Sequence, residues 1–247
     1  MTLINQLQEL EGGLAILIDP DKTNQRSELE PLVEKVNLLD PAFIFVGGST
    51  VDEDDFENCI VVLKELTDIP VIIFPGSFRQ LSDKADGILF LSLVSGRNPD
   101  YLIGHQVEAA PHLRKMNVEV MPTAYLLIDG GKNSSVAYVS QTTPIPNDQT
   151  TIAINTSIAG EMMGMQAVFL DAGSGAKNTV SPSMISDVKQ NIDVPLIVGG
   201  GIRSVEDYEA AKGAGANLIV IGNKIEEDMD FLLDLMNITI KENFTSN

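Results

Sequence analysis

The sequence reads FLDAGSGA at residues 169–176, LIVGGGIRS at 196–204 and LIVIGNKIEE at 218–227. Each segment is a short apolar run followed directly by a turn that contains glycine, and a helical pattern separates one segment from the next. Glycine lets backbone N–H groups approach an anion without steric hindrance, and a turn that opens a helix adds the positive end of the helix dipole. Three such turns predict a phosphate-binding site at the C-terminal face of a barrel.

The same unit of strand and helix extends over the whole chain. Near-continuous apolar runs are typical of parallel strands buried on both faces, and eight of them occupy residues 14–18, 43–46, 70–74, 87–91, 118–127, 167–170, 195–198 and 217–221. We therefore predict a closed, parallel (β/α)8 TIM barrel of the phosphate-binding type, formed by one domain over residues 1–247. An open doubly wound sheet is the alternative, but no G-x-G-x-x-G motif follows the first strand.

Helix signals lie between most of these runs. Apolar residues at helical spacing predict a helix over 28–39. An Asn-Pro pair predicts the start of a helix over 98–115, and a Ser-Pro pair at 181–182 predicts another. A serine followed by an aspartate three residues later resembles a capping box at the start of 204–214. The space for a helix at 78–86 is short.

The long segment Asp129–Asp148 stands out among the loops. It follows the fifth apolar run, and in a barrel such loops gather at the C-terminal face. Long loops there commonly form lids or substrate walls. We expect one of these roles for this segment.

The charge balance restricts the partners of the protein. The chain has 35 Asp and Glu against 16 Lys and Arg, a formal net charge of −19. This balance argues against binding to nucleic acid and against a polybasic contact with anionic lipid. No apolar run reaches the ~18 residues of a membrane span, so we expect no stable membrane insertion. The N-terminus shows no secretory signal, and the single cysteine fits a reducing compartment. The sequence thus predicts a cytoplasmic protein.

Oxygen-bearing side chains follow the first two strands. Asp19 and Asp21 lie in LIDPDK (17–22), and Ser49 and Thr50 lie in FVGGST (45–50). Neighbouring strands of a barrel bring these turns together, and Mg²⁺ prefers oxygen ligands and shares phosphate oxygens with a substrate. The two motifs together favour a magnesium site over the structural alternative, a turn with an Asp cap.

Two further residues are candidates for the chemistry. Asp171, beside the glycines of the first turn, is suited to act as a general base or to orient a substrate hydroxyl. Tyr125, within the fifth strand, is expected either at the barrel mouth, bonded to a polyol or phosphate, or packed with its hydroxyl satisfied internally. His105 and His112 share a helix face, but no carboxylate lies at ligand spacing, which favours surface or groove histidines over a metal site.

The motifs taken together resemble a known family. LIDPDK, FVGGST, SLVSGRNPDYLIGHQVEAAP (92–111), AYLLIDGG, FLDAGSGA, VGGGIRS and VIGNKIE occur in the order seen in the geranylgeranylglyceryl phosphate synthase family, over nearly the whole chain. The set is most similar to the branch that includes bacterial members. The resemblance implies a Mg²⁺-dependent prenyltransferase that joins the C3 hydroxyl of sn-glycerol 1-phosphate to a polyprenyl diphosphate, with geranylgeranyl as the expected chain. It also implies a homo-oligomer.

The resemblance assigns roles to individual residues. It implies that Asp19 and Ser49 hold Mg²⁺ and that Tyr125 lines the glycerol phosphate site. It implies that glycerol phosphate is bound by Phe169, Leu170, Asp171, Ala172, Gly173, Ser174, Gly175, Gly200, Gly201, Gly222 and Asn223. The chain departs from the family pattern in two places. Related sequences often read Tyr-Leu-Glu at 169–171, and some carry a basic residue where this chain has Leu17.

A prenyl chain needs an apolar groove. The candidate wall residues come from the third and fourth strands and the helix that follows: Phe74, Phe78, Leu91, Leu93, Tyr101, Leu102 and Ile103. Ordinary packing of helices on a barrel is the alternative for each of them. Two other functions compete: a phosphosugar isomerase, epimerase or aldolase on the same barrel, and a non-catalytic sensor of a phosphorylated ligand. No lysine lies within a predicted strand to form a Schiff base, and Asp19 with Ser49 argues against a sensor.

Overall fold

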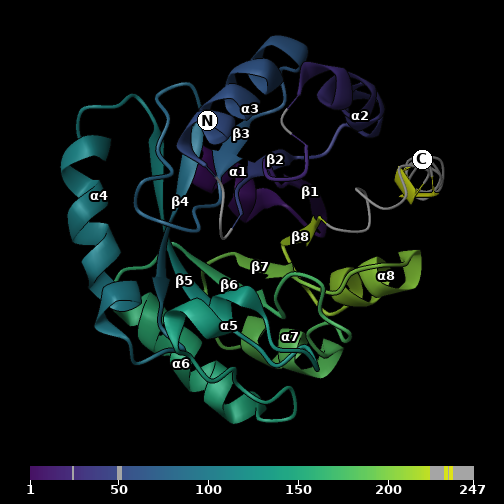
Figure 1. The fold of residues 1–247 in the computed structure, drawn as a ribbon. Helices are drawn as coiled ribbons and strands as arrows, with labels where there is room; N and C mark the ends of the chain where they lie inside the picture. Colours follow the sequence, from purple (N-terminus) through teal and green to yellow (C-terminus); the bar gives the residue numbers. More distant parts are fainter. Residues whose placement is uncertain (24, 49–51, 223–230, 233, 236–247) are drawn as a thin grey trace.

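The computed structural model describes residues 1–23, 25–48, 52–222, 231–232 and 234–235 and shows a closed barrel of eight parallel strands (Figure 1). Each strand pairs with the next, and β1 pairs with both β2 and β8, so the sheet has no free edge. The closed barrel confirms the predicted fold and excludes the open sheet. The strands are β1 (Gly13–Ile18), β2 (Phe43–Val46), β3 (Val71–Ile73), β4 (Gly87–Leu93), β5 (Glu119–Leu127), β6 (Ala167–Asp171), β7 (Leu196–Gly199) and β8 (Leu218–Ile221).

Helices cover the outside of the barrel. Figure 1 shows α2 and α3 at the top, α4 at the left, α5 to α7 below and α8 at the right. The elements are α1 (Leu3–Glu9), α2 (Arg26–Leu39), α3 (Glu53–Leu66), the π-helical turn η1 (Asp100–Gly104), α4 (His105–Leu113), α5 (Ser135–Ser140), α6 (Thr150–Met162), α7 (Pro182–Lys189) and α8 (Val205–Gly213). Within the described residues, none of these helices is long and apolar enough to span a bilayer.

The barrel lacks a covering helix between β3 and β4. Residues 74–86 are all described, and they form a loop with turns instead of the short helix for which the sequence left room. Among the described residues, that loop, η1 and α4 lie beside β4 at this point. This gap in the helical layer is the main departure from the regular alternation of one strand and one helix.

Alternating strand residues build two apolar layers. Phe43, Phe45 and Phe169 point into the barrel and belong to its inner cluster. Ile44 and Leu170, each next to an inward residue, belong to the larger cluster between strands and helices. Because both faces of every strand are buried, the strands read as continuous apolar runs rather than as alternating ones.

The bottom of the barrel is closed by α1. The Glu119 carboxylate at the start of β5 accepts hydrogen bonds from the backbone N–H groups of Leu3, at 2.8 Å, and Ile4, at 2.9 Å. These groups belong to the first turn of the helix, which has no intrahelical acceptor for them. Leu7 of the same helix is 1% exposed inside the barrel. With the bottom closed, the opposite end, where the strands terminate, remains for a site.

The predicted helix starts are confirmed with one change. Ser181 caps α7, and Ser204 with Asp207 forms a capping box on α8. Asn98 accepts a hydrogen bond from the N–H of Asp100 at 3.0 Å. The element that follows begins as a π-helical turn before it continues as α4.

Candidate active site

One cavity of about 370 Å³ opens at the C-terminal ends of the strands and continues sideways past β4. Its volume is in the range typical of small-molecule sites. The mouth is lined by residues that follow β1, β6, β7 and β8, among them Asp19, Gly173, Gly200 and Gly222. The lateral part is apolar. The cavity therefore joins a polar head to an apolar extension.

The glycine turns after β6 and β7 are in direct contact. A Cβ atom on Gly200 would lie 2.6 Å from the backbone nitrogen of Gly173 and 2.7 Å from Oδ1 of Asp171. Gly200 has φ +81° and Gly173 has φ +89°, a region that L side chains rarely adopt. Glycine at these positions thus allows the main chains of the two turns to come into contact. This geometry agrees with the predicted site, in which backbone rather than side chains forms the wall.

The residues predicted to bind a head group do not all face the cavity. Eight of them line it: Phe169, Asp171, Gly173, Ser174, Gly175, Gly200, Gly201 and Gly222. The side chains of Leu170 and Ala172 are buried in the layer that faces the helices, because side chains alternate along a strand. Asn223, Ser49 and Thr50 lie outside the described residues.

Asp171 and Tyr125 form a buried pair at the floor of the mouth. The Tyr125 hydroxyl donates a hydrogen bond to Oδ2 of Asp171 at 2.5 Å, and the Gly173 N–H donates to Oδ1 at 2.7 Å. Burial raises the pKa of Asp171 above its ordinary value, partly offset by these two hydrogen bonds. Burial, and then the neighbouring carboxylate, raises the pKa of Tyr125. The tyrosine hydroxyl is thus satisfied internally, as the second alternative expected, while the residue also lines the cavity; a bond to a polyol or phosphate stays a prediction.

Asp19 lines the cavity at the end of β1. Its Oδ1 accepts a hydrogen bond from the N–H of Asp21 at 3.2 Å, and Oδ2 lies 3.6 Å from Nζ of Lys22. Among the described residues, no group of three or more His, Cys, Asp or Glu side chains is placed to hold a metal. One carboxylate at a cavity wall still suits Mg²⁺, which keeps waters and binds through one or two carboxylates together with substrate phosphates.

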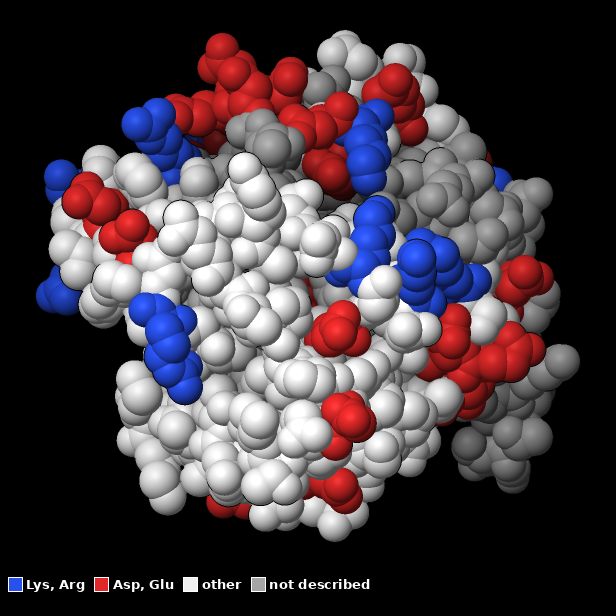
Figure 2. Space-filling model, turned by 60° about the horizontal axis from the view of Figure 1, so that its bottom comes forward, with Lys and Arg blue, Asp and Glu red and all other residues white. Residues whose placement is uncertain are grey.

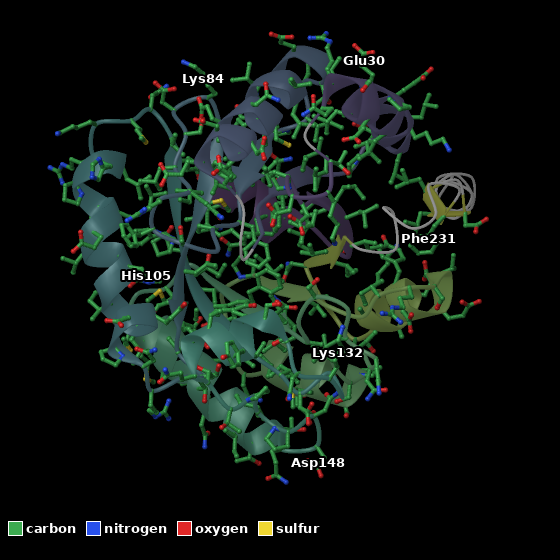
Figure 3. All side chains as sticks on the ribbon, viewed as in Figure 1. Glu30, Lys84, His105, Lys132, Asp148 and Phe231 are labelled. Carbon is green, nitrogen blue, oxygen red and sulfur yellow. The ribbon has the colours of Figure 1, made fainter. Side chains whose placement is uncertain are left out.

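Aromatic rings connect the mouth to the apolar extension. The Phe74 ring stacks on Phe169 with centroids 5.3 Å apart and meets Tyr125 edge-on at 6.1 Å. Farther out, the ring of His105 lies 5.5 Å from Phe78 and 4.6 Å from Tyr101. Figure 3 shows His105 on the side of α4 that is turned toward β4. Burial lowers the pKa of His105, which favours a neutral imidazole in this apolar setting.

Two of the predicted groove residues lie elsewhere. Phe74, Phe78, Leu91, Leu93 and Tyr101 line the cavity, whereas Leu102 and Ile103 do not. Ile103 is 59% exposed. The prediction treated this segment as a regular α-helix, and the π-helical turn at its start changes which side chains face β4.

Sequence reasoning also missed part of the groove wall. Ile88 and Phe90 on the outward side of β4, together with Gln106 and Ala109 on α4, line it as well. The spacing of His105 and Ala109, four residues apart on one helix face, was the available signal. The outward residues of β4 carried no signal, because a covering helix normally hides them.

In Figure 2 acidic side chains gather along the upper edge and at the right and also stand singly on the central and lower part of the face, while the blue side chains form a few small groups. Two basic residues, Lys22 and Arg203, line the cavity itself. A site for an anion in a chain of charge −19 therefore combines backbone amides with a few local cations.

Comparisons with known proteins agree with this geometry. The model of the PcrB family matches residues 6–241. The chain is 50% identical over 236 residues to the geranylgeranylglyceryl phosphate synthase of Flavobacterium johnsoniae, which covers 94% of this chain and 97% of the relative. Two solved structures are similar with a TM-score of 0.89 and 35% identity: wild-type GGGPS from Thermoplasma volcanium, covering 97% of this chain and 96% of that one, and (S)-3-O-geranylgeranylglyceryl phosphate synthase from Thermoplasma acidophilum in complex with its substrate sn-glycerol-1-phosphate, covering 96% of each.

Proposed function

The chain belongs to the PcrB family, and on that premise we propose that it is a geranylgeranylglyceryl phosphate synthase. In this reaction the C3 hydroxyl of sn-glycerol 1-phosphate attacks C1 of a polyprenyl diphosphate, expected to be geranylgeranyl diphosphate. A C–O ether bond forms, the bond from C1 to diphosphate breaks, and the product is an ether lipid precursor. The observation that carries the proposal is one cavity that joins a glycine-built wall to an apolar groove past a buried carboxylate.

The turns after β6, β7 and β8 are the proposed site of the glycerol phosphate head group. Gly173, Gly175, Gly200 and Gly201 all have positive φ and line the mouth. Such backbone lets N–H groups come close to phosphate oxygens without a side chain between them. Holding the acceptor there turns a bimolecular encounter into an oriented one, which accounts for a large part of catalysis in general.

Asp171 is the proposed acceptor of the hydroxyl proton. Each of its oxygens already receives one hydrogen bond, and a carboxylate oxygen has room for a second donor. A raised pKa makes the carboxylate a better proton acceptor for an alcohol that becomes an ether oxygen. Because the pKa of Tyr125 is raised as well, its phenol stays protonated and keeps the carboxylate in position. The shorter Asp, where relatives often carry Glu, is held in place by this tyrosine.

Asp19 and Ser49 are the proposed residues that would hold Mg²⁺. The support is the position of the Asp19 carboxylate on the cavity wall and the oxygen chemistry of both side chains. When bound, the ion supplies positive charge that stabilises the departing diphosphate. Lys22, 3.6 Å from Asp19, adds a second positive charge on the same side of the mouth.

The groove between the loop 74–86 and α4 is the proposed site of the prenyl chain. Its walls are apolar and aromatic, which suits a hydrocarbon tail. A phosphosugar isomerase or aldolase has no use for such an extension. The groove therefore favours the prenyltransferase over the competing functions on this barrel.

We further propose a homo-oligomer in the cytoplasm. Apolar side chains are exposed on successive helices, with Val107 61%, Tyr138 86% and Ile152 47% exposed. Exposed apolar groups that are neighbours on a surface are typical of protein contacts. The single cysteine, Cys59, is buried and needs no oxidising compartment. Light scattering of the purified chain tests the oligomeric state.

The function is tested by product formation. The protein is incubated with radiolabelled sn-glycerol 1-phosphate and prenyl diphosphates of graded length, with and without Mg²⁺, and the lipid fraction is extracted. We expect a labelled lipid whose yield is highest with geranylgeranyl diphosphate and which requires the metal. Label that stays in the aqueous phase under all conditions would contradict the proposal.

A further inference from the structure

We propose that Lys132, on the loop after β5, is a positioning residue that binds the phosphate of the head group and selects a phosphorylated acceptor. This inference rests on the proposed function and extends it to a residue outside the three glycine turns. Figure 3 shows Lys132 between α5 and α8, on a loop separate from those turns.

The ammonium group lies directly over the glycine turn of β6. A Cβ atom placed on Gly175 would be 3.2 Å from Nζ of Lys132, the nearest atom to that position. Gly175 lines the cavity and has φ +68°. A side chain there would meet the lysine at close contact, so the glycine leaves space beside the ammonium group. Gly175 belongs to the turn where the head group is proposed to bind, so the ammonium group lies next to that turn.

Backbone contacts fix the loop that carries Lys132. The carbonyl of Gly130 accepts hydrogen bonds from the N–H groups of Lys177, at 2.8 Å, and Asn178, at 3.0 Å. On the other side, Ser134 is buried and its Oγ accepts the N–H of Ala137 at 3.2 Å. A Cβ on Gly173 would lie 2.8 Å from Cβ of Ser134. The loop after β5 is thus packed onto the loop after β6 on both sides of the lysine.

The charge of Lys132 is not neutralised by any of the described residues. Over the part of the chain that the structure describes, no carboxylate lies within 4.0 Å of its ammonium group. Lys22, which lines the cavity, is by contrast close to Asp19. In a chain of charge −19, a cation next to an anion site offsets the general repulsion of a phosphate.

The chemistry distinguishes Lys132 from the glycines. Backbone amides orient a phosphate, and an ammonium group adds a charge-assisted hydrogen bond that favours the dianion over a neutral glycerol. Such a bond is worth roughly a factor of ten in affinity. The side chain is exposed, so its contribution is screened by salt.

The test compares Lys132→Met with wild type. We expect the KM for sn-glycerol 1-phosphate to rise about tenfold, with kcat and the KM for the prenyl diphosphate changed less than about twofold and with the melting temperature unchanged. The difference between Lys132→Met and wild type in the KM for sn-glycerol 1-phosphate should become smaller at high salt. Lys132→Arg should restore most of the affinity, because it keeps the charge. A purely structural role would not produce this pattern.

Lys177→Met is the matched control, since Lys177 lies on the neighbouring loop and is also exposed, but Nζ of Lys132 and not that of Lys177 lies beside the Cβ position of Gly175. It should leave both KM values as in wild type. An unchanged KM in Lys132→Met, or an equal rise in Lys177→Met, would overturn the assignment. Calorimetric titration with sn-glycerol 1-phosphate keeps the test independent of turnover: weaker binding to Lys132→Met supports the assignment even if wild type forms no product, and equal binding overturns it.

Discussion

Asp171 is the proposed general base. It is buried, accepts hydrogen bonds from Tyr125 and Gly173 and has a raised pKa. Asp171→Asn keeps an acceptor for Gly173 and a polar partner for Tyr125 but cannot take a proton. We expect kcat to fall by about 10²–10⁴, measured under saturation with both substrates. A variant with near wild-type kcat would remove the general base from the mechanism.

The same substitution also affects stability, and the size of that effect depends on pH. Burial raises the folded pKa of Asp171 above its ordinary value, so the folded protein loses stability relative to the unfolded chain as pH rises through that window. Asn carries no charge and escapes this loss. The melting temperature of Asp171→Asn minus that of wild type should therefore increase from pH 4 to neutral pH. A difference that decreases over this range would contradict the raised pKa.

Gly200 tests the contact between the two glycine turns. In Gly200→Ala the new methyl would lie 2.6–2.8 Å from three atoms of residues 171–173 at φ +81°. We expect a stability loss of at least about 2 kcal/mol and a higher KM for glycerol phosphate, measured by urea unfolding and by kinetics. Gly213→Ala, with nothing within 4 Å of the added methyl, is the control and should be neutral or slightly stabilising. Equal behaviour of the two variants would contradict the close approach.

The sequence predicts the positions of some site residues but not the contacts of others. The glycine turns and Asp171 could be identified because glycine after an apolar run has few other uses. The bond between Tyr125 and Asp171 could not, because it joins strands 46 residues apart. Lys132 gave no signal for a similar reason. Its contact with Gly175 depends on how two loops pack.

At the scale of elements, the missing helix between β3 and β4 creates the groove. Ala109 on α4 lines it and is 5% exposed, so Ala109→Phe should shorten the space for a chain. We expect a large loss of activity with geranylgeranyl diphosphate and much less with geranyl diphosphate, measured as kcat/KM for each. The neighbouring Ala110 is exposed, and Ala110→Phe should keep the wild-type preference. If Ala109→Phe lowered kcat/KM equally for both prenyl diphosphates, the prenyl chain would not bind in this groove.

The α1 plug is an element that should matter for stability alone. Glu119→Ala removes the acceptor of two N–H groups in the first turn of α1. We expect a loss of about 1–3 kcal/mol in urea unfolding, with kcat and both KM values unchanged under conditions where the variant is folded. A kinetic defect in the folded variant would show that the two ends of the barrel are coupled.

Elements whose signal is local were predicted correctly. Ser204 with Asp207 and Ser181 with the proline after it mark helix starts through bonds within four residues, and both caps are present. The π-helical turn at Asp100–Gly104 was not predicted, and Ile103 was assigned to the groove in error. An Asn-Pro start is compatible with either kind of helix, so the distinction lies in packing against β4 rather than in the sequence.

For the whole molecule, eight apolar runs separated by helical patterns were enough to predict the closed barrel, because eight strand–helix units are the number that closes a (β/α)8 barrel and no G-x-G-x-x-G motif of the open doubly wound sheet follows the first run. The function required more than the fold, since this barrel serves many reactions. The resemblance of the ordered motifs supplied it, and the cavity joins a glycine-built mouth to an apolar groove, as the proposed reaction requires.

The central claim is that backbone of the loops after β6, β7 and β8 holds the glycerol phosphate while the groove beside β4 holds the prenyl chain. A crystal structure of the protein with sn-glycerol 1-phosphate and a non-reactive prenyl diphosphate analogue tests it most directly. The account predicts the head group among Gly173, Gly175 and Gly200, its C3 hydroxyl beside Asp171, and the chain between loop 74–86 and α4. A head group bound at any other face, or a chain that leaves the mouth by another path, would contradict it.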